Sequence, residues 1–562
     1  MRFYVSLFCA TMAYWGLSPA ALSREPALAA LVPANAIVCL TTPDLAQLDS
    51  HWAATGFCRL WQDDALRDFR ISFHRATRLT PDFDQSLLGV SWQQLLERAS
   101  GEACWALVPI SESDAGFLLL VDVSQHMAEA TQTVAELRGQ SSTAEDMDRQ
   151  YFLEAGVLGI SNRHELAGKA LEWLKNPPQE NLLASAAYRT VAEQCQVATG
   201  KPPAQLNWYI QPWAFQALVA RAGFQGVGKT WNQLAAEGFQ VIQAAGGVIN
   251  LATAEHDLEH RWLVFAPGER KNAARLLDFS PLADFVLPTW VPADIDAVLD
   301  VHWKLAGALT GYGSHFDATY AEGIKGTFEA VLADIHQEPD GPQVDIRSLV
   351  NLQAGPVLSL TKTLSDGKTA VVYAVKVSDE PQMARSLQRM FETDEGVHRK
   401  TVGKYEMWEF AGSSATDTDE VALGPNLAEC ALCVAEDYFF VATSATDLES
   451  LLSDPPSAKL NDEKSYQALQ TQAAATRSQH TIGWHIAPVA AGVRPLYEEL
   501  RTAGTADLGQ LLGEAPSDNH RVDLSRLPTG AVLPGFIAAS WGLIDQVDDG
   551  WLMRGSILKH VE

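Results

Sequence analysis

Short apolar stretches separated by turn-forming residues give the first part of the chain its pattern. Residues 102–109 and 117–123 are two such stretches, and the polar segment 111–114 lies between them. The arrangement recurs at residues 151–154 and 157–160, where Ala155 and Gly156 form the break. After each pair, apolar residues return at helical spacing. The pattern therefore predicts units made of a β-hairpin followed by a helix.

The same order of segments occurs a second time. The hexapeptide Asn-Trp-Tyr-Ile-Gln-Pro at 207–212 resembles Gly-Trp-His-Ile-Ala-Pro at 483–488, and Leu-Val-Pro-Ala-Asn at 31–35 resembles Trp-Val-Pro-Ala-Asp at 290–294. Self-similarity over such a length indicates a repeated architecture. Further segments match in the same order: 101–104 with 355–358, 121–124 with 375–378, 159–166 with 441–448, 177–178 with 455–456, and Tyr188 with Tyr466.

These patterns predict an α+β fold made of two tandem, similar domains, residues 23–285 and 286–562. Each domain is expected to contain mainly antiparallel sheet built from β-hairpin-helix units. Links this short join antiparallel strands, because parallel strands need a crossover of a dozen or more residues.

The first 22 residues have the features of a secretory signal peptide. Arg2 precedes an apolar run at 5–17, and Ser-Pro-Ala-Ala at 18–21 supplies the small residues of a cleavage site. No later apolar stretch reaches the length that a membrane helix needs. We therefore expect an exported protein of the periplasm or extracellular space, with no integral membrane segment in the mature chain.

Charge and cysteine content narrow the possible partners. The chain has 41 basic and 69 acidic residues, a net charge of −28, which opposes binding to nucleic acid and anionic lipid. Cysteines are sparse, and five of the six beyond the signal have no counterpart in the other half of the chain. Buried free thiols are expected rather than a shared disulfide framework. The six are Cys39, Cys58, Cys104, Cys195, Cys430 and Cys433.

With these segments assembled, the chain resembles a bacterial family of exported proteins that contain a domain of unknown function. The residues that carry the resemblance are 31–35, Pro43-Asp44, 238–242 with Gly246-Gly247, Pro267-Gly268 with Arg270-Lys271, and 341–346. It covers most of the mature chain. The resemblance implies export and a two-copy fold, and it implies no activity or catalytic residues.

A phosphate-binding loop is the first chemical motif to consider. Residues 223–230, Gly-Phe-Gln-Gly-Val-Gly-Lys-Thr, match G-x-x-x-x-G-K-T, in which backbone amides and the lysine hold nucleotide phosphates. Such a loop must follow a buried strand, whereas the preceding residues 213–222 have a helical pattern. We interpret the motif as a glycine-rich connection between helices.

The second chemical motif is a zinc-binding pattern. His256, Glu259 and His260 match H-x-x-E-H, whose histidines would share one face of a helix while the glutamate acts as a base. Here the motif lies between two apparent strands, and no third ligand is identified. A polar hairpin tip is the favoured interpretation, and a metal-dependent hydrolase using these three residues is the alternative function.

Two further patterns are weaker. Cys430 and Cys433 have redox spacing but lie in an apparent strand, where residues three apart point to opposite faces. Asp417, Asp419 and Glu420 lack the glycine and terminal glutamate of a calcium-binding loop. Both are interpreted as structural features.

The recurring tryptophans Trp208 and Trp484 are expected to be core residues repeated with the fold. No serine, histidine and acid form a defensible triad. We therefore assign no catalytic, cofactor-binding or metal residues and expect no cofactor. The predicted function is that of a non-catalytic binding or structural module of the bacterial cell envelope, whose partner is an unknown envelope protein or an apolar ligand.

Overall fold

The protein is described from a computed structural model. The described residues are 27–77, 90, 92–111, 114–140, 150–196, 204–221, 225–282, 286–339, 341–364, 369–392, 394, 396–410, 430–453, 458–488, 493–502, 504–507 and 521–560. The predicted signal peptide at 1–22 lies outside them. In the described part of the chain, no helix combines the length and apolar character needed to cross a bilayer.

The fold is α+β, as predicted, and its largest element is one 18-stranded antiparallel sheet. The strands are β1 (Val38–Thr42), β2 (Ala103–Ser111), β3 (Asp114–Asp122), β4 (Gln150–Glu154), β5 (Val157–Ser161), β6 (Leu206–Ile210), β7 (Ala244–Leu251), β8 (His256–Phe265), β9 (Ala297–Val301), β10 (Gln353–Thr363), β11 (Thr369–Val377), β12 (Val397–Val402), β13 (Tyr405–Phe410), β14 (Ala431–Ala435), β15 (Tyr438–Ala442), β16 (Thr481–Ala487), β19 (Ser540–Val547) and β20 (Gly550–Leu558). A separate hairpin pairs β17 (Thr505–Asp507) with β18 (Arg521–Asp523).

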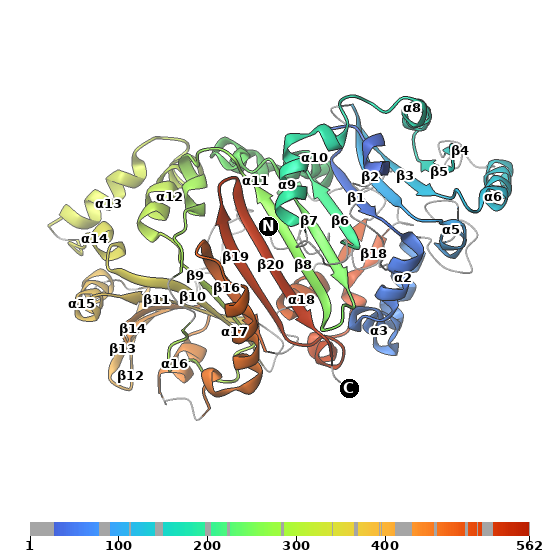
Figure 1. Ribbon diagram of the computed structural model, residues 1–562. Helices are drawn as coiled ribbons and strands as arrows, with labels where there is room; N and C mark the ends of the chain where they lie inside the picture. Colours follow the sequence, from blue (N-terminus) through green and yellow to red (C-terminus); the bar gives the residue numbers. More distant parts are fainter. Residues whose placement is uncertain are drawn as a thin grey trace.

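The pairings define the order of strands across the sheet. It is β4-β5-β3-β2-β1-β6-β7-β8-β20-β19-β16-β9-β10-β11-β15-β14-β13-β12. The eight strands from β8 outward to β4 and the eight strands from β20 outward to β14 are connected along the chain in the same way. Strands β13 and β12 extend the sheet beyond β14. The sheet therefore continues through the expected boundary at residue 286 (Figure 1).

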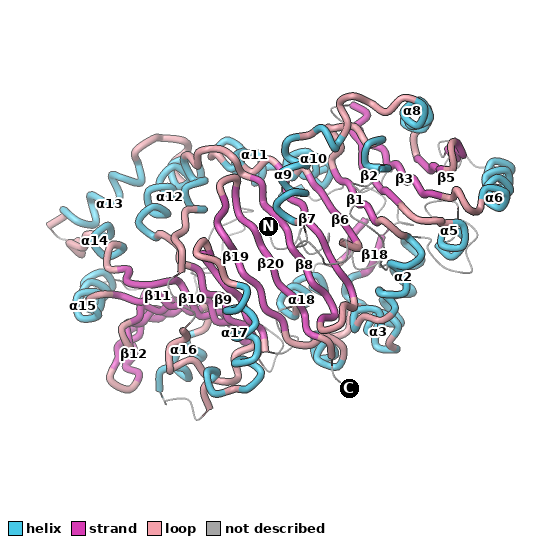
Figure 2. The backbone as a smooth tube through the Cα atoms, viewed as in Figure 1, coloured by secondary structure: helices cyan, strands magenta, loops and turns pink. Residues whose placement is uncertain are grey.

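Helices cover both faces of this sheet (Figures 1 and 2). On the first face, α8, α9, α16 and α17 pack against the strands. On the second face, α2, α5, α6, α10, α14 and α15 do so. The α-helices are α2 (Leu45–Ala53), α3 (Gly56–Gln62), α4 (Arg67–Thr77), α5 (Trp92–Arg98), α6 (Met127–Gln140), α8 (His164–Lys175), α9 (Ala186–Cys195), α10 (Pro212–Arg221), α11 (Gln225–Ala236), α12 (Leu305–Thr319), α13 (Thr327–Gln337), α14 (Ile346–Val350), α15 (Glu380–Phe391), α16 (Ala445–Ser453), α17 (Lys464–Thr476) and α18 (Arg494–Thr502).

Local sequence explains how the first unit begins. Asp44 has extended backbone angles and accepts a hydrogen bond from the Gln47 amide at 2.9 Å, which caps the first turn of α2. Leu45 and Leu48 of this helix are buried in the core. The Asp44 cap therefore fixes the beginning of α2 at Leu45.

The register of β6 and β16 corrects the predicted equivalence of the two tryptophans. Trp208 lies opposite Leu40 and Gly247. His485, not Trp484, has the matching neighbours, Leu299 and Gly542. A shift of one residue on a strand moves a side chain to the other face. The prediction that both tryptophans occupy the same core position is therefore wrong: Trp484 is fully buried on the first face, and Trp208 is partly buried on the second.

A second contact region joins distant parts of the chain. Helices α3 and α4 form one apolar cluster with α18, β18 and the 3-10 helices η10 (Leu524–Arg526) and η11 (Gly530–Gly535). At its edge the Gly56 amide donates to both carboxylate oxygens of Asp257, at 3.0 and 2.8 Å. A Cβ on Gly56 would lie 1.9 Å from the Phe536 carbonyl oxygen. Only glycine fits this approach of three segments.

We expect Gly56→Ala to lower the free energy of unfolding by about 1–3 kcal/mol, because the backbone must move to relieve the overlap. Urea denaturation measures this. The matched control is Gly168→Ala in α8, where no atom lies within 4 Å of the added methyl group. This control should gain up to about 1 kcal/mol from helix propensity. Equal effects of the two variants would contradict the packing argument.

Trp484 also generates a pH prediction. Its indole N–H donates to Asp300 Oδ2 at 3.0 Å, and Asp300 is 1% exposed. Burial raises the pKa of Asp300 to about 7, although the Trp484 hydrogen bond opposes the shift. The folded protein therefore holds this proton more tightly than the unfolded chain, and the associated stability is lost as pH rises from about 4 through 7.

Asp300→Asn removes the ionisation and keeps an acceptor for Trp484. We expect the variant to exceed the wild type in stability by about 2–4 kcal/mol at pH 8.5 and to differ little at pH 4. Urea midpoints at the two pH values provide the comparison. Asp334→Asn, at an exposed position on α13, is the control and should show no such pH dependence. A constant difference at both pH values would contradict the assignment to Asp300.

Candidate functional site

Two arginines face each other at the centre of the sheet. Arg261 on β8 lies directly opposite Arg554 on β20, and both point to the first face. Their neighbours on the outer strands are Val248 and Leu543, which are buried apolar residues. Directly opposed like charges destabilise an antiparallel pair. The arrangement therefore needs compensating groups.

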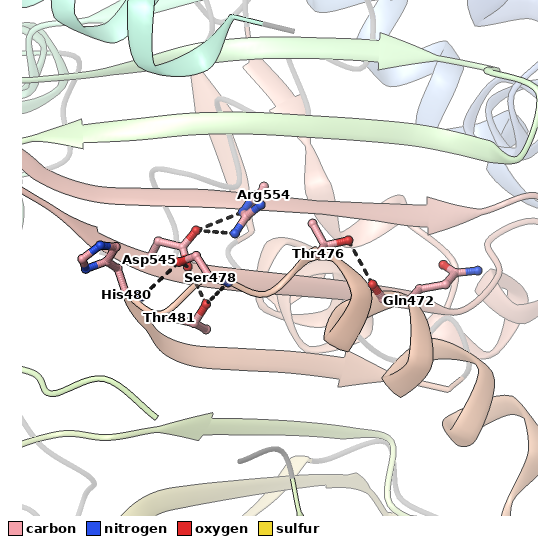
Figure 3. A network of polar contacts seen from close by, with 7 residues as sticks. All are labelled: Gln472, Thr476, Ser478, His480, Thr481, Asp545 and Arg554. Atoms are coloured by element: carbon pink, nitrogen blue, oxygen red, sulfur yellow. Dashed lines mark hydrogen bonds and ion pairs between the residues drawn. The ribbon is translucent and has the colours of Figure 1, made fainter. Parts of the chain in front are cut away.

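Arg554 has its compensation in Asp545 of β19 (Figure 3). The Arg554 Nε and Nη2 groups donate to Asp545 Oδ2 at 3.0 and 2.6 Å. The other oxygen, Oδ1, accepts from Thr481 Oγ1 at 2.6 Å and Ser478 Oγ at 3.0 Å. Asp545 is 4% exposed, so this buried carboxylate is fully occupied by four donors.

Arg261 has no comparable partner. Within the described residues, its guanidinium makes no hydrogen bond or ion pair, and its Nε atom is buried. Burial is the largest effect on this group and lowers the pKa of Arg261; the Arg554 charge acts in the same direction, and nearby Cys195 and Asp545 oppose both. Because an arginine keeps its charge under such shifts, a cation remains on this face.

Two further polar groups beside the arginines also lack partners. Ser556 lies opposite Trp541 on β19 and opposite Glu259 on β8. The Ser556 Oγ and Trp541 Nε1 atoms are both buried, and neither has a hydrogen-bond partner in the described part of the protein. Leaving a buried polar group unsatisfied costs about 1–3 kcal/mol. Such groups concentrated at one place mark a candidate binding surface.

A polar pocket of about 660 Å³ lies at one end of the central strands. In it, Arg270 Nη2 lies 3.6 Å and Lys304 Nζ 3.5 Å from the same oxygen of Asp278, so that two cations share one carboxylate. Arg270 also stacks on the Trp551 ring, 5.4 Å from its centroid. The lining residues are Gly268, Glu269, Arg270, Arg275, Asp278, Phe279, Pro281, Lys304, His480, Gln546, Val547 and Asp548.

The pocket is connected to the Asp545 network through two of its lining residues. The Gln546 amide donates to the His480 carbonyl at 2.9 Å. The His480 amide in turn donates to Ser478 Oγ at 3.1 Å (Figure 3). Two hydrogen bonds therefore join the pocket lining to the residues that hold Asp545.

The second face of the same strands carries two histidines. His260 and His485 lie in one row across the sheet, separated by Gly555 and Gly542. The His260 Nε2 atom lies 3.1 Å from where a Cβ of Gly555 would be, so the imidazole extends over this glycine. Burial lowers the pKa of both histidines to about 4, and the neighbouring His485 lowers the pKa of His260 further. Both are neutral at pH 7.

The predicted zinc motif is not assembled as a metal site. His256, Glu259 and His260 all lie on β8, where four residues span about 13 Å. His256 Nδ1 is 2.6 Å from Glu259 Oε1, while His260 lies over Gly555. The described residues contain no cluster of three or more histidine, cysteine or acidic side chains placed to hold a metal.

The other motifs are also placed by the fold. The part of 223–230 that the structure describes lies within α11, and helix α10, not a strand, precedes it. The predicted helical context is thus observed: residues 225–230 begin α11, and residues 222–224, between α10 and α11, lie outside the described residues. Cys430 and Cys433 are buried free thiols, as are the other four described cysteines. Asp417, Asp419 and Glu420 lie outside the described residues.

Sequence reasoning missed Arg261, Arg554 and their neighbours. The available signal was one arginine beside apolar residues in each of the segments 261–265 and 551–558. Their pairing depends on β8 meeting β20, which no local pattern predicts.

The comparisons with known proteins found nothing similar: no protein-family model, no curated protein and no solved structure matches this chain.

The neutral histidines lead to a second pH prediction. The folded-state pKa of about 4 lies below the unfolded value near 6.5, so the unfolded chain takes up protons first as the solution is acidified. Stability should fall between about pH 6.5 and 4. We expect the double variant His260→Gln with His485→Gln to lose about 2–4 kcal/mol less than the wild type over this interval.

Urea midpoints at pH 7 and 4.5 measure the difference. His302→Gln is the control, because this exposed residue should leave the acid sensitivity unchanged. Wild-type and double-variant profiles of equal slope would contradict the prediction.

Proposed function

We propose that the chain is an exported, non-catalytic binding module of the bacterial cell envelope, and that the pocket at the end of the central strands holds a small anionic ligand. The observation that carries the proposal is the pairing of Arg270 and Lys304 with the single carboxylate of Asp278. Arg275 adds a third cation to the lining. Guanidinium and ammonium groups recognise carboxylates and phosphates.

Among the described residues, Asp278 is the acidic lining residue that pairs with these cations, and Glu269 and Asp548 do not. Glu269 Oε2 lies 3.6 Å from the ammonium group of Lys271, outside the pocket lining. Asp548 is exposed at the β19–β20 turn. The lining contains three basic and three acidic side chains, whereas the whole chain has 41 basic and 69 acidic residues, so the pocket is less acidic than the chain as a whole.

The proposal includes two copies of one fold, residues 23–285 and 286–562, which share a single sheet. Support comes from the common strand order, with β4-β5-β3-β2-β1-β6-β7-β8 on one side and β14-β15-β11-β10-β9-β16-β19-β20 on the other. The pocket receives residues from both sides of the junction. Export remains supported by the signal-like segment at 1–22.

An apolar ligand is the second candidate, favoured by the aromatic residues on the second face. Trp105, Trp208 and Trp262 are all partly buried there, and the rings of Trp208 and Trp262 lie 6.1 Å apart. Partly exposed tryptophans beside neutral histidines suit an aromatic or apolar molecule. An unknown envelope protein is the corresponding macromolecular partner.

The hydrolase alternative has less support. His256 is paired with Glu259 and is separated along β8 from His260. Elemental analysis of the purified protein tests the hydrolase alternative directly, because near-stoichiometric zinc would support it.

Thermal unfolding tests the anion proposal. Inorganic phosphate and citrate are the probes, with chloride at equal ionic strength as the reference. At ten times its dissociation constant, a bound anion should raise the melting temperature by about 1–2 °C. We expect Arg275→Met combined with Lys304→Met to lower this rise by the contribution of the pocket, because it removes two of the three cations.

Lys404→Met is the matched control, since its ammonium lies at the exposed β12–β13 turn. It should retain the full response. Native mass spectrometry of protein purified from the envelope fraction then separates the two candidates: a bound small acid supports the pocket, and a bound lipid or aromatic molecule supports the second face. No anion response and no bound molecule would contradict both.

A further inference from the structure

We propose that the centre of the first face is a second, separate oxyanion site, in which Arg261, Ser556 and Trp541 donate hydrogen bonds to a carboxylate or phosphate group. This site does not depend on the pocket lined by Arg270 and Lys304. It lies in the middle of β8, β20 and β19, whereas the pocket is at their end.

The first argument is the set of unsatisfied donors. Arg261 Nε, Ser556 Oγ and Trp541 Nε1 are buried atoms without partners among the described residues. Ser556 is 2% and Trp541 9% exposed, so neither side chain has ready access to bulk water. All three can donate, and one acceptor with several lone pairs, such as an oxyanion, satisfies them together.

Their positions in the sheet place these donors around one point. Ser556 lies directly opposite Trp541 and is the diagonal neighbour of Arg261 across the β8–β20 pair. Adjacent strands are about 4.8 Å apart, so the outermost of the three Cα atoms are separated by about 12 Å. Long arginine and tryptophan side chains approach one small group across such a distance.

The second argument is charge. Arg261 and Arg554 are directly opposed, and Asp545 is committed to Arg554 and two hydroxyl groups. Glu259, which also lies near, is hydrogen-bonded to His256 at 2.6 Å. One positive charge therefore remains on Arg261 without a committed carboxylate. A bound anion would supply the missing charge and relieve the repulsion between the arginines.

The side chains of the proposed oxyanion site differ in their exposure. Arg261 and Glu259 are partly exposed, in contrast to the buried Ser556 and Trp541. Figure 1 shows β8 and β20 side by side between the flanking helices α9 and α17.

Titration with inorganic phosphate and, separately, with succinate tests the site, using thermal unfolding and isothermal calorimetry on the full chain. A response to phosphate alone identifies a phosphate ligand, and a response to succinate alone identifies a carboxylate ligand. We expect Arg261→Met to weaken binding at least about tenfold, since it removes a charged hydrogen bond. Trp541→Phe and Ser556→Ala should each weaken it about threefold to tenfold.

Controls separate this site from a structural role and from the pocket. Trp290→Phe removes another buried, unpartnered indole N–H at a different place and should leave the affinity unchanged, as should Arg389→Met on the exposed face of α15. The Arg275→Met and Lys304→Met double variant should also retain this binding event. Without ligand, Arg261→Met should melt no lower than the wild type, because it removes a like-charge contact.

The proposal is overturned if neither probe binds the folded wild type with a dissociation constant of about 10 mM or lower. It is equally overturned if Arg261→Met, Trp541→Phe and Ser556→Ala all bind as the wild type does. A destabilised Arg261→Met with unaltered binding in the other two variants would assign Arg261 to structure alone.

Discussion

The antiparallel pairing of β8 with β20 is the contact on which the rest of this structure depends. Residues more than 280 positions apart, such as Arg261 and Arg554, lie directly opposite each other across it. Without this pairing each side would end in an exposed strand, with unpaired amide and carbonyl groups open to other chains. With it, the edges of β8 and β20 pair with each other, and one sheet of 18 strands runs through the molecule.

The same pairing concentrates polar groups where a sheet is usually apolar. Each central strand brings an arginine to the first face, and the second face carries His260 and His485 over two glycines. Strand neighbours position these groups rigidly, because their backbones are hydrogen-bonded on both sides. A binding surface built in this way needs little reorganisation when a ligand arrives.

Local signals in the chain predicted a large part of the fold. The hairpin at 102–123 and the helix start at Asp44 follow from turn chemistry and helix capping, and both are present. The prediction that Trp208 and Trp484 occupy equivalent positions was wrong, because sequence similarity does not define a strand register. Two strands displaced by one residue keep similar composition and expose opposite faces. Trp208 lies between Leu40 and Gly247, and the residue between the corresponding Leu299 and Gly542 is His485.

The sequence by itself determined the α+β class, the antiparallel hairpins and the negative net charge, because each depends on periodicity, turn residues or composition. Tertiary structure alone decided that the sheet is continuous, that Arg261 meets Arg554, and that Asp545 is occupied by Arg554 while Ser556 and Trp541 are not satisfied. These facts depend on contacts between segments far apart in the chain. Hydrogen bonding between such segments is set by which strands become neighbours, and no local pattern of residues encodes that choice.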